Sequence, residues 1–316
     1  FYQATSFNQP LSNWDVSEVT MTGGMFSSAT SFNQDLGNWN VSGLTDAQNM
    51  FNNATSFNQD LSSWNISSVT NATGMFTGVT LSSINYSNML VSWSAQPVQS
   101  GVVFSGGSSK YYTGSPTTAR GVLTGTYGWT ITDGGQNTTD FVTKWNTVNT
   151  STGSSTEYQV QLPLSSTGTY NFTVNWGDGT TSTITTWNQA ETLHTYASTG
   201  TYDIVITGTL IGINFNNTGD RLKLTDISQW GTSFKLGNTG SYFYGAANLG
   251  ITAEDVLNLT GTTTMSNAFR GCTSLTTVPS MNNWDMSGVT NMYQLFWNAT
   301  SFNQDVGSWN VSNVTN

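Results

Sequence analysis

Apolar residues recur in the N-terminal part of the chain with a constant spacing of 25 residues. Phenylalanines open the successive copies at Phe1, Phe26, Phe51 and Phe76, and nearly identical text follows the first three. The pattern fades after Phe76 and returns near the C-terminus, with a longer copy at Phe269 and a close copy at Phe296. A unit this short cannot bury an apolar face alone, so neighbouring copies must cover one another. The period therefore predicts a solenoid in each of these two regions.

Within one copy, the hydrophobic pattern predicts a short strand and then a short helical turn. Trp14 and Val16 lie two residues apart, so a strand would bury both side chains and leave Asp15 on the outer face. The apolar residues between Val19 and Phe26 are three to four residues apart, which favours one helical or 3-10 turn. We expect successive strands to stack about 4.8 Å apart in a parallel sheet.

The period is lost from Tyr86 onward. Tyr86, Leu90 and Trp93 lie at i, i+4 and i+7 and predict an amphipathic helix. Ser115-Pro116 predicts the start of a second helix, and the segment Trp129–Thr132 predicts a closing strand. We interpret residues 85–135 as a cap on the first array, which covers residues 1–84.

Short alternating runs between Gly, Ser and Thr turns fill residues 136–212. The runs Tyr158–Leu162, Tyr170–Asn175 and Tyr202–Ile206 predict strands, and their spacing is typical of a β-sandwich. Residues 213–316 then predict a second repeat array with irregular early copies.

The repeat text resembles a known family. The pattern M-F-x-x-A-T-S-F-N-Q-D-L-x-x-W-N-V-S-x-V-T stands at Met25–Thr45 and Met50–Thr70 and, with substitutions, at Leu295–Thr315. It resembles the BspA-like leucine-rich-repeat surface proteins, and FRGCTSL at Phe269–Leu275 resembles their cysteine-containing variant. The resemblance implies a leucine-rich-repeat-like solenoid, secretion, and attachment to cells or extracellular material.

The middle segment resembles a second family. VNWGDGT at Val174–Thr180 and the text from His194 to Gly208 are similar to immunoglobulin-like modules of the polycystic-kidney-disease (PKD) type. The resemblance implies a spacer in an extracellular protein. The predicted fold class is therefore mixed and β-rich, with leucine-rich-repeat-like solenoid segments flanking an immunoglobulin-like (PKD-type) β-sandwich.

Composition narrows the function classes. Only 8% of residues are charged, and the net charge of -10 argues against a basic nucleic-acid-binding face and against docking to anionic membranes. No run approaches the roughly 18 apolar residues of a membrane helix. The surplus of Ser, Thr, Asn and Gly is typical of extracellular proteins. We expect the lone Cys272, aligned with alanines of other copies, to be buried, and the lone His194 to be structural.

The candidate partner face is a set of outward polar residues one repeat apart, namely Asp15, Asn40 and Asn65 in the first array and Asp285 and Asn310 in the second. Regularly spaced amides and carboxylates could bind a glycan, ice-like water or calcium, or could satisfy one another. Asp178 in the Gly-Asp-Gly turn is one carboxylate, which is poor for calcium. We assign no catalytic residue, cofactor or metal.

These observations predict a non-enzymatic, extracellular structural or adhesive repeat protein, a rod-like surface adhesin or filament segment. Its partners would be a surface receptor, a glycan or further copies of itself. The alternatives are a dedicated glycan-binding module and the accessory region of a larger secreted hydrolase. Because Phe1 and Asn316 both fall inside a repeat, we also expect these residues to be a segment of a longer modular chain.

Overall fold

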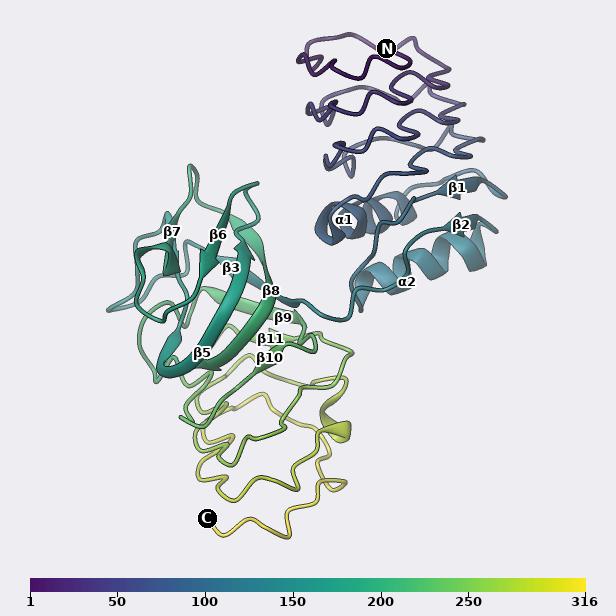
Figure 1. Cartoon of the computed structure of the whole chain (residues 1–316). Coiled ribbons are helices and arrows are strands. Elements are labelled where there is room, and N and C mark those ends of the chain that lie inside the picture. The colour runs from purple at the N-terminus through teal and green to yellow at the C-terminus, as the bar shows by residue number, and fades with distance from the viewer. The chain divides into compact units, whose positions relative to one another are not determined.

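The computed structural model describes residues 1–316 and divides them into two compact units, Phe1–Asn137 and Thr138–Asn316 (Figure 1). Each unit has its own hydrophobic core. The finer sequence-based division into four segments stays a prediction.

The repeats of the first unit lie one above another as loops, as the purple and blue turns in Figure 1 show. Phe26 stacks on Phe51 with 5.5 Å between ring centroids, and Phe51 stacks on Phe76 at 5.3 Å. Trp39 and Trp64 are buried, and each indole Nε1 donates a hydrogen bond to the leucine carbonyl 28 residues earlier. The rings of these copies therefore form the core, as their spacing predicts. In the first copy Trp14 is 48% exposed, so the prediction that it is buried with Val16 is wrong.

The expected solenoid sheet is wrong, because the repeats contain turns instead of strands. The Trp14 amide donates to the Leu11 carbonyl and the Val19 amide to the Val16 carbonyl, so these groups are used in local turns. Backbone hydrogen bonds join neighbouring repeats, such as that from the Phe26 amide to the Met50 carbonyl, but the β-bridges between them are isolated, such as that between Met21 and Asp46. Since no continuous ladder forms, none of the three sheets of the chain is a solenoid sheet.

Helix α1 (Ser83–Ser94) follows the repeats and continues their hydrogen-bond pattern. Tyr86, Leu90 and Trp93 are buried, which confirms the predicted helical face. Trp93 Nε1 donates to the Leu61 carbonyl at 3.2 Å, so it takes the role of the repeat tryptophan. Ser82 caps the helix with its hydroxyl and donates its own amide to Asn58 Oδ1 at 2.7 Å.

A small α/β segment completes the first unit. Strand β1 (Val103–Ser105) pairs in parallel with β2 (Thr130–Thr132), and α2 (Ser115–Gly121) with a π-turn at Val122–Thr126 connects them. Asp133 joins this segment to α1, because its carboxylate accepts hydrogen bonds from Arg120 Nε and from the Tyr86 hydroxyl, each at 2.8 Å.

The second unit is built on one seven-stranded sheet in the order β11-β9-β3-β8-β5-β6, with β10 also paired to β8. Its strands are β3 (Phe141–Asn146), β5 (Leu164–Asn175), β6 (Thr181–Ile184), β8 (Thr201–Ile213), β9 (Leu224–Gln229), β10 (Phe234–Lys235) and β11 (Gly250–Ile251). A separate two-stranded sheet pairs β4 (Gln159–Gln161) with β7 (Leu193–Thr195) after a 3-10 turn at Ala190–Thr192, and another 3-10 turn spans Met281–Asn283.

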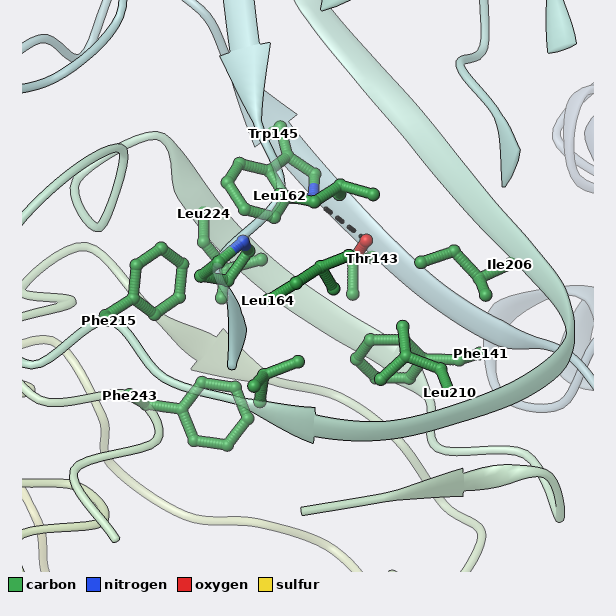
Figure 2. A pocket seen from close by; sticks show the side chains of 12 residues that line it. Phe141, Thr143, Trp145, Leu162, Leu164, Ile206, Leu210, Phe215, Leu224 and Phe243 are labelled. Carbon is green, nitrogen blue, oxygen red and sulfur yellow. Dashed lines mark hydrogen bonds between the residues drawn. The ribbon is translucent and has the colours of Figure 1, made fainter. Parts of the chain in front are cut away.

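The expected self-contained immunoglobulin-like sandwich is also wrong. The central strand β3 pairs on one side with β8 and on the other with β9, which lies beyond the predicted sandwich boundary at residue 212. One core joins the sheet to the repeats that follow it, and Figure 2 shows Phe243 of these repeats facing the same small cavity as Phe141 and Leu210 of the sheet. The sheet therefore buries its apolar residues partly against the repeats.

Candidate functional site

A fixed repeat position of the second unit builds an outward-facing column. Phe243, Phe269 and Phe296 stack in the core at 5.3 and 5.7 Å, and the residue after each of them lies outside. We call these outer residues the cleft column; they are Tyr244, Arg270 and Trp297.

The local backbone explains why the column faces outward. The residue after each column member has a positive φ, as at Gly245 (81°) and Gly271 (71°), and this left-handed turn returns the chain to the core. The amide of Gly245 donates to the Arg270 carbonyl, and that of Gly271 to the Trp297 carbonyl, each at 2.8 Å. These bonds place the three column members in adjacent repeats.

The Arg270 guanidinium lies between two aromatic rings. Its Cζ is 4.7 Å from the Tyr244 ring centroid and 4.2 Å from that of Trp297, which are cation–π distances. Nη1 donates to Gln294 Oε1 at 2.7 Å and to Asn267 Oδ1 at 3.3 Å. The Nε and Nη2 groups have no protein partner, so one edge of a well-held guanidinium is open.

The cleft column lines an open cleft of about 500 Å³, which we call the Arg270 cleft. Arg221, Asn217 and Asn298 also line it. Arg221 Nη1 donates to Ser151 Oγ at 2.8 Å, and its side chain lies across Gly245. A Cβ at Gly245 would collide with Asn217 Oδ1 and lie 2.8 Å from Arg221 Cδ, so only glycine allows this approach.

The charge of the cleft differs from that of the whole protein. The chain has only seven lysines and arginines and a net charge of -10, yet two arginines line the cleft and no carboxylate does. A local positive field with aromatic walls attracts anions and stacks planar or ring-shaped groups. The arrangement can bind and orient an anionic ligand.

The sequence-predicted partner face consists of exposed turns. Asp15, Asn40 and Asn65, here called the Asx column, each accept through Oδ1 the backbone amide and hydroxyl of the serine two residues later. Asp285 is bonded in the same way to Ser287, and Asn310 accepts the amide of Ser312. These serine hydrogen bonds lower the pKa of Asp15 and Asp285.

No hydrogen bond joins successive members of the Asx column, so each residue serves its own turn. No group of three or more His, Cys, Asp or Glu side chains is placed to hold a metal ion. The role of these residues as a ligand face stays a prediction.

A different set of asparagines connects the repeats. Asn8 Oδ1 accepts the amide of Asn33, and Asn33 Oδ1 accepts that of Asn58, at 2.9 and 2.8 Å. These asparagines follow a core phenylalanine of each repeat, and this position predicts that they lie inside the protein and bond backbone groups. They do bond backbone, but they are exposed at the edge of the stack.

Cys272 and His194, the single cysteine and histidine of the chain, are both held by packing contacts. Cys272 is fully buried, and this burial raises the pKa of its thiol to about 12. His194 Nε2 contacts Asp178 Oδ2 at 2.8 Å, and its ring stacks on Trp176 at 4.7 Å. Burial raises the pKa of Asp178, but hydrogen bonds from Thr180 and His194 outweigh it and leave that pKa lowered.

The enclosed cavity of the second unit is not a ligand site. Figure 2 shows it surrounded by apolar side chains such as Leu162, Ile206 and Phe215. Its volume is about 20 Å³, which is room for one water molecule at most. The Trp145 indole is satisfied by the Thr143 hydroxyl at 2.9 Å, so no free polar group of this pair points into it.

A comparison with known protein families identifies the family of the repeats. The family described as Mycoplasma protein of unknown function, DUF285, matches residues 1–89 and 213–316, which are more than half of the chain. The chain belongs to the DUF285 family. No curated protein and no solved structure matches it.

The Arg270 cleft lies in the second DUF285 segment, and the equivalent column of the first segment is different. There the residues after the stacked phenylalanines are Tyr2, Ser27, Asn52 and Thr77, without a cation. Sequence reasoning missed the cleft because it followed the constant positions of the DUF285 repeat. The signal that would have found the cleft is the residue type at the variable position after each phenylalanine.

Proposed function

We propose that this DUF285 protein is a non-enzymatic, extracellular attachment protein that contacts its partner through the Arg270 cleft. The observation that carries the proposal is the guanidinium fixed between Tyr244 and Trp297 with an open hydrogen-bonding edge. A rigid, partly desolvated arginine beside aromatic rings is typical of residues that dominate binding energy at interfaces.

The repeat construction supports the same proposal. In the first unit, stacked rings, the Trp64 Nε1–H group and the Asn33 Oδ1 atom connect neighbouring repeats, and this leaves the outer positions free to vary. The neutral polar surface and the resemblance of the repeat text to BspA-like surface proteins favour an extracellular location. Neither helix is long and apolar enough to cross a membrane.

A binding role suits the chemistry available. The single thiol is buried with a pKa of about 12, so it is protonated and enclosed near neutral pH. The cleft is lined by cations, amides and aromatic rings, which bind ligands, and it contains no carboxylate, histidine or cysteine that would serve as an acid, base or nucleophile.

The test is saturable attachment of the intact chain. Fluorescently labelled protein is incubated with beads coated with mucin, with extracellular-matrix protein or, as the control, with albumin. We expect saturable binding to at least one of the first two surfaces, with light scattering showing no change in mass of the free protein. Equal, non-saturable retention on all three surfaces would refute attachment. Growth of large assemblies without surface binding would favour the filament alternative.

A further inference from the structure

We propose that the Arg270 cleft binds anionic saccharides, with arginine edges holding a carboxylate or sulfate group and the Trp297 ring stacking on the sugar. The inference rests on the proposed attachment function and names its ligand class. It follows from three features of the cleft.

The anion-binding feature is a pair of arginine edges. In Arg270 and in Arg221, Nη1 is bonded to protein, whereas Nε and Nη2 have no protein partner. Nε–H and Nη2–H point in parallel from one side of a guanidinium and match the two oxygens of a carboxylate or sulfate. The bonds through Nη1 hold each fork in place, so little conformational entropy is lost when the anion binds.

The sugar-binding feature is the exposed indole of Trp297. One face of the ring lies 4.2 Å from Arg270 Cζ, and 54% of the residue remains exposed. The negative face of an aromatic ring attracts the polarised C–H groups of a pyranose ring. Asn217 and Asn298 add exposed amides, which donate to and accept from hydroxyl groups.

The shape of the cleft favours a saccharide over an acidic peptide. None of its lining residues belongs to a strand, so the cleft offers no sheet edge to which an extended peptide could add. Its volume of about 500 Å³ lies within the range of small-ligand pockets, roughly 300–1,000 Å³, and fits one to three sugar rings.

The experiment measures dissociation constants of the full chain by calorimetry at low and physiological salt. The probes are trigalacturonate, a chondroitin sulfate tetrasaccharide, neutral galactotriose and a pentaglutamate peptide. We expect at least one acidic saccharide to bind about tenfold or more tightly than galactotriose, because a hydrogen bond to a charged group adds about that factor. Pentaglutamate should bind no better than galactotriose. The two acidic probes distinguish carboxylate from sulfate.

Variants locate the binding. Arg270→Gln and Trp297→Ala should each weaken the acidic saccharide about tenfold or more, and Arg270→Lys should weaken it too, because lysine keeps the charge but lacks the fork. Lys110→Gln is the matched control, since it removes one exposed positive charge from the other unit. Melting curves check folding, and Arg221→Gln replaces Arg270→Gln if the latter does not fold.

Three results would overturn the inference. They are equal affinity for acidic and neutral saccharides, tighter binding of pentaglutamate than of the saccharides, and an equal loss in Lys110→Gln and Arg270→Gln. If the cleft variants still attach to coated beads as the unmodified chain does, the cleft is not the contact surface, and both the saccharide site and the cleft part of the proposed function are wrong. If instead no saccharide binds but the cleft variants lose attachment, the ligand class is wrong while the proposed function stands. If the unmodified chain attaches to no surface, the proposed function itself fails.

Discussion

Replacing Trp64 by alanine tests whether the stacked rings hold the repeats together. Trp64 is fully buried, its ring lies 6.5 Å from that of Trp39, and its Nε1 donates to the Leu36 carbonyl at 2.9 Å. The substitution removes the ring, leaves a cavity between two repeats and removes one hydrogen bond.

The expected loss in free energy of unfolding is about 3–5 kcal/mol, the range for buried Phe or Trp to Ala changes. The hydrogen bond accounts for about 1 kcal/mol of this. The Leu36 carbonyl keeps a second donor, the Trp39 amide, so it is not left without a partner. Most of the loss is therefore lost packing.

The assay is urea unfolding followed by circular dichroism and by tryptophan fluorescence. Trp64→Phe is the first control: it keeps a ring but removes the Nε1–H donor, so it should cost less than the alanine variant. Trp14→Ala is the matched control, because Trp14 occupies the same repeat position but is 48% exposed and makes no Nε1 hydrogen bond. We expect it to cost at least about 2 kcal/mol less than Trp64→Ala.

An equal loss in free energy of unfolding in the two alanine variants would contradict a special role of the buried ring. A loss under about 1 kcal/mol in Trp64→Ala would also contradict it, since burial would then not decide the contribution of this position.

Three further predictions concern other parts of the chain. Cys272 should resist an excess of thiol reagent at pH 8 in the native protein and react at once in denaturant, because burial holds its pKa near 12; Cys272→Ala should cost roughly 1 kcal/mol by thermal melting. Changing the whole Asx column to serine should shift the melting temperature by only a few degrees, since exposed substitutions stay within about 0.5 kcal/mol each, and a collapse of the fold would show that these turns are essential. Lys223→Met should lower the free energy of unfolding, measured in urea, by about 3–5 kcal/mol, because the change leaves the charge of Asp220 without its ion-pair partner. The buried Nζ lies 3.4 Å from Asp220 and donates to Ser155, Thr156 and Gln159, and an unchanged stability would contradict the prediction.

The sequence by itself determined which side chains are buried in the repeats. A 25-residue period requires each copy to cover the next, so the recurring Phe, Trp and Ala positions are predicted to be internal. Trp39, Trp64 and Cys272 are buried at these positions, whereas Trp14 is 48% exposed. The helical spacing of Tyr86, Leu90 and Trp93 likewise determined which face of the helix is buried, because these residues form a single apolar stripe along it.

Only the tertiary structure decided how the backbone runs between these buried positions. Alternation such as Trp14-Asp15-Val16 fits a strand as well as a turn, and the choice depends on where the amides find acceptors. In the repeats, several backbone amides donate to the carbonyl three residues earlier, so turns form instead of a solenoid sheet. Likewise, β9 pairs with β3 across a boundary that local patterns place between separate domains.

The Arg270 cleft also depends on contacts that the linear sequence does not display. Tyr244, Arg270 and Trp297 are 26 and 27 residues apart, and their roles emerge only when each repeat is hydrogen-bonded to the next. Arg221 precedes the regular repeats and reaches the cleft only because Gly245 leaves room for it. The period fixes which residues face the core, whereas the stacking of repeats fixes which variable residues become neighbours on the surface, and in this protein the candidate site consists of those variable residues.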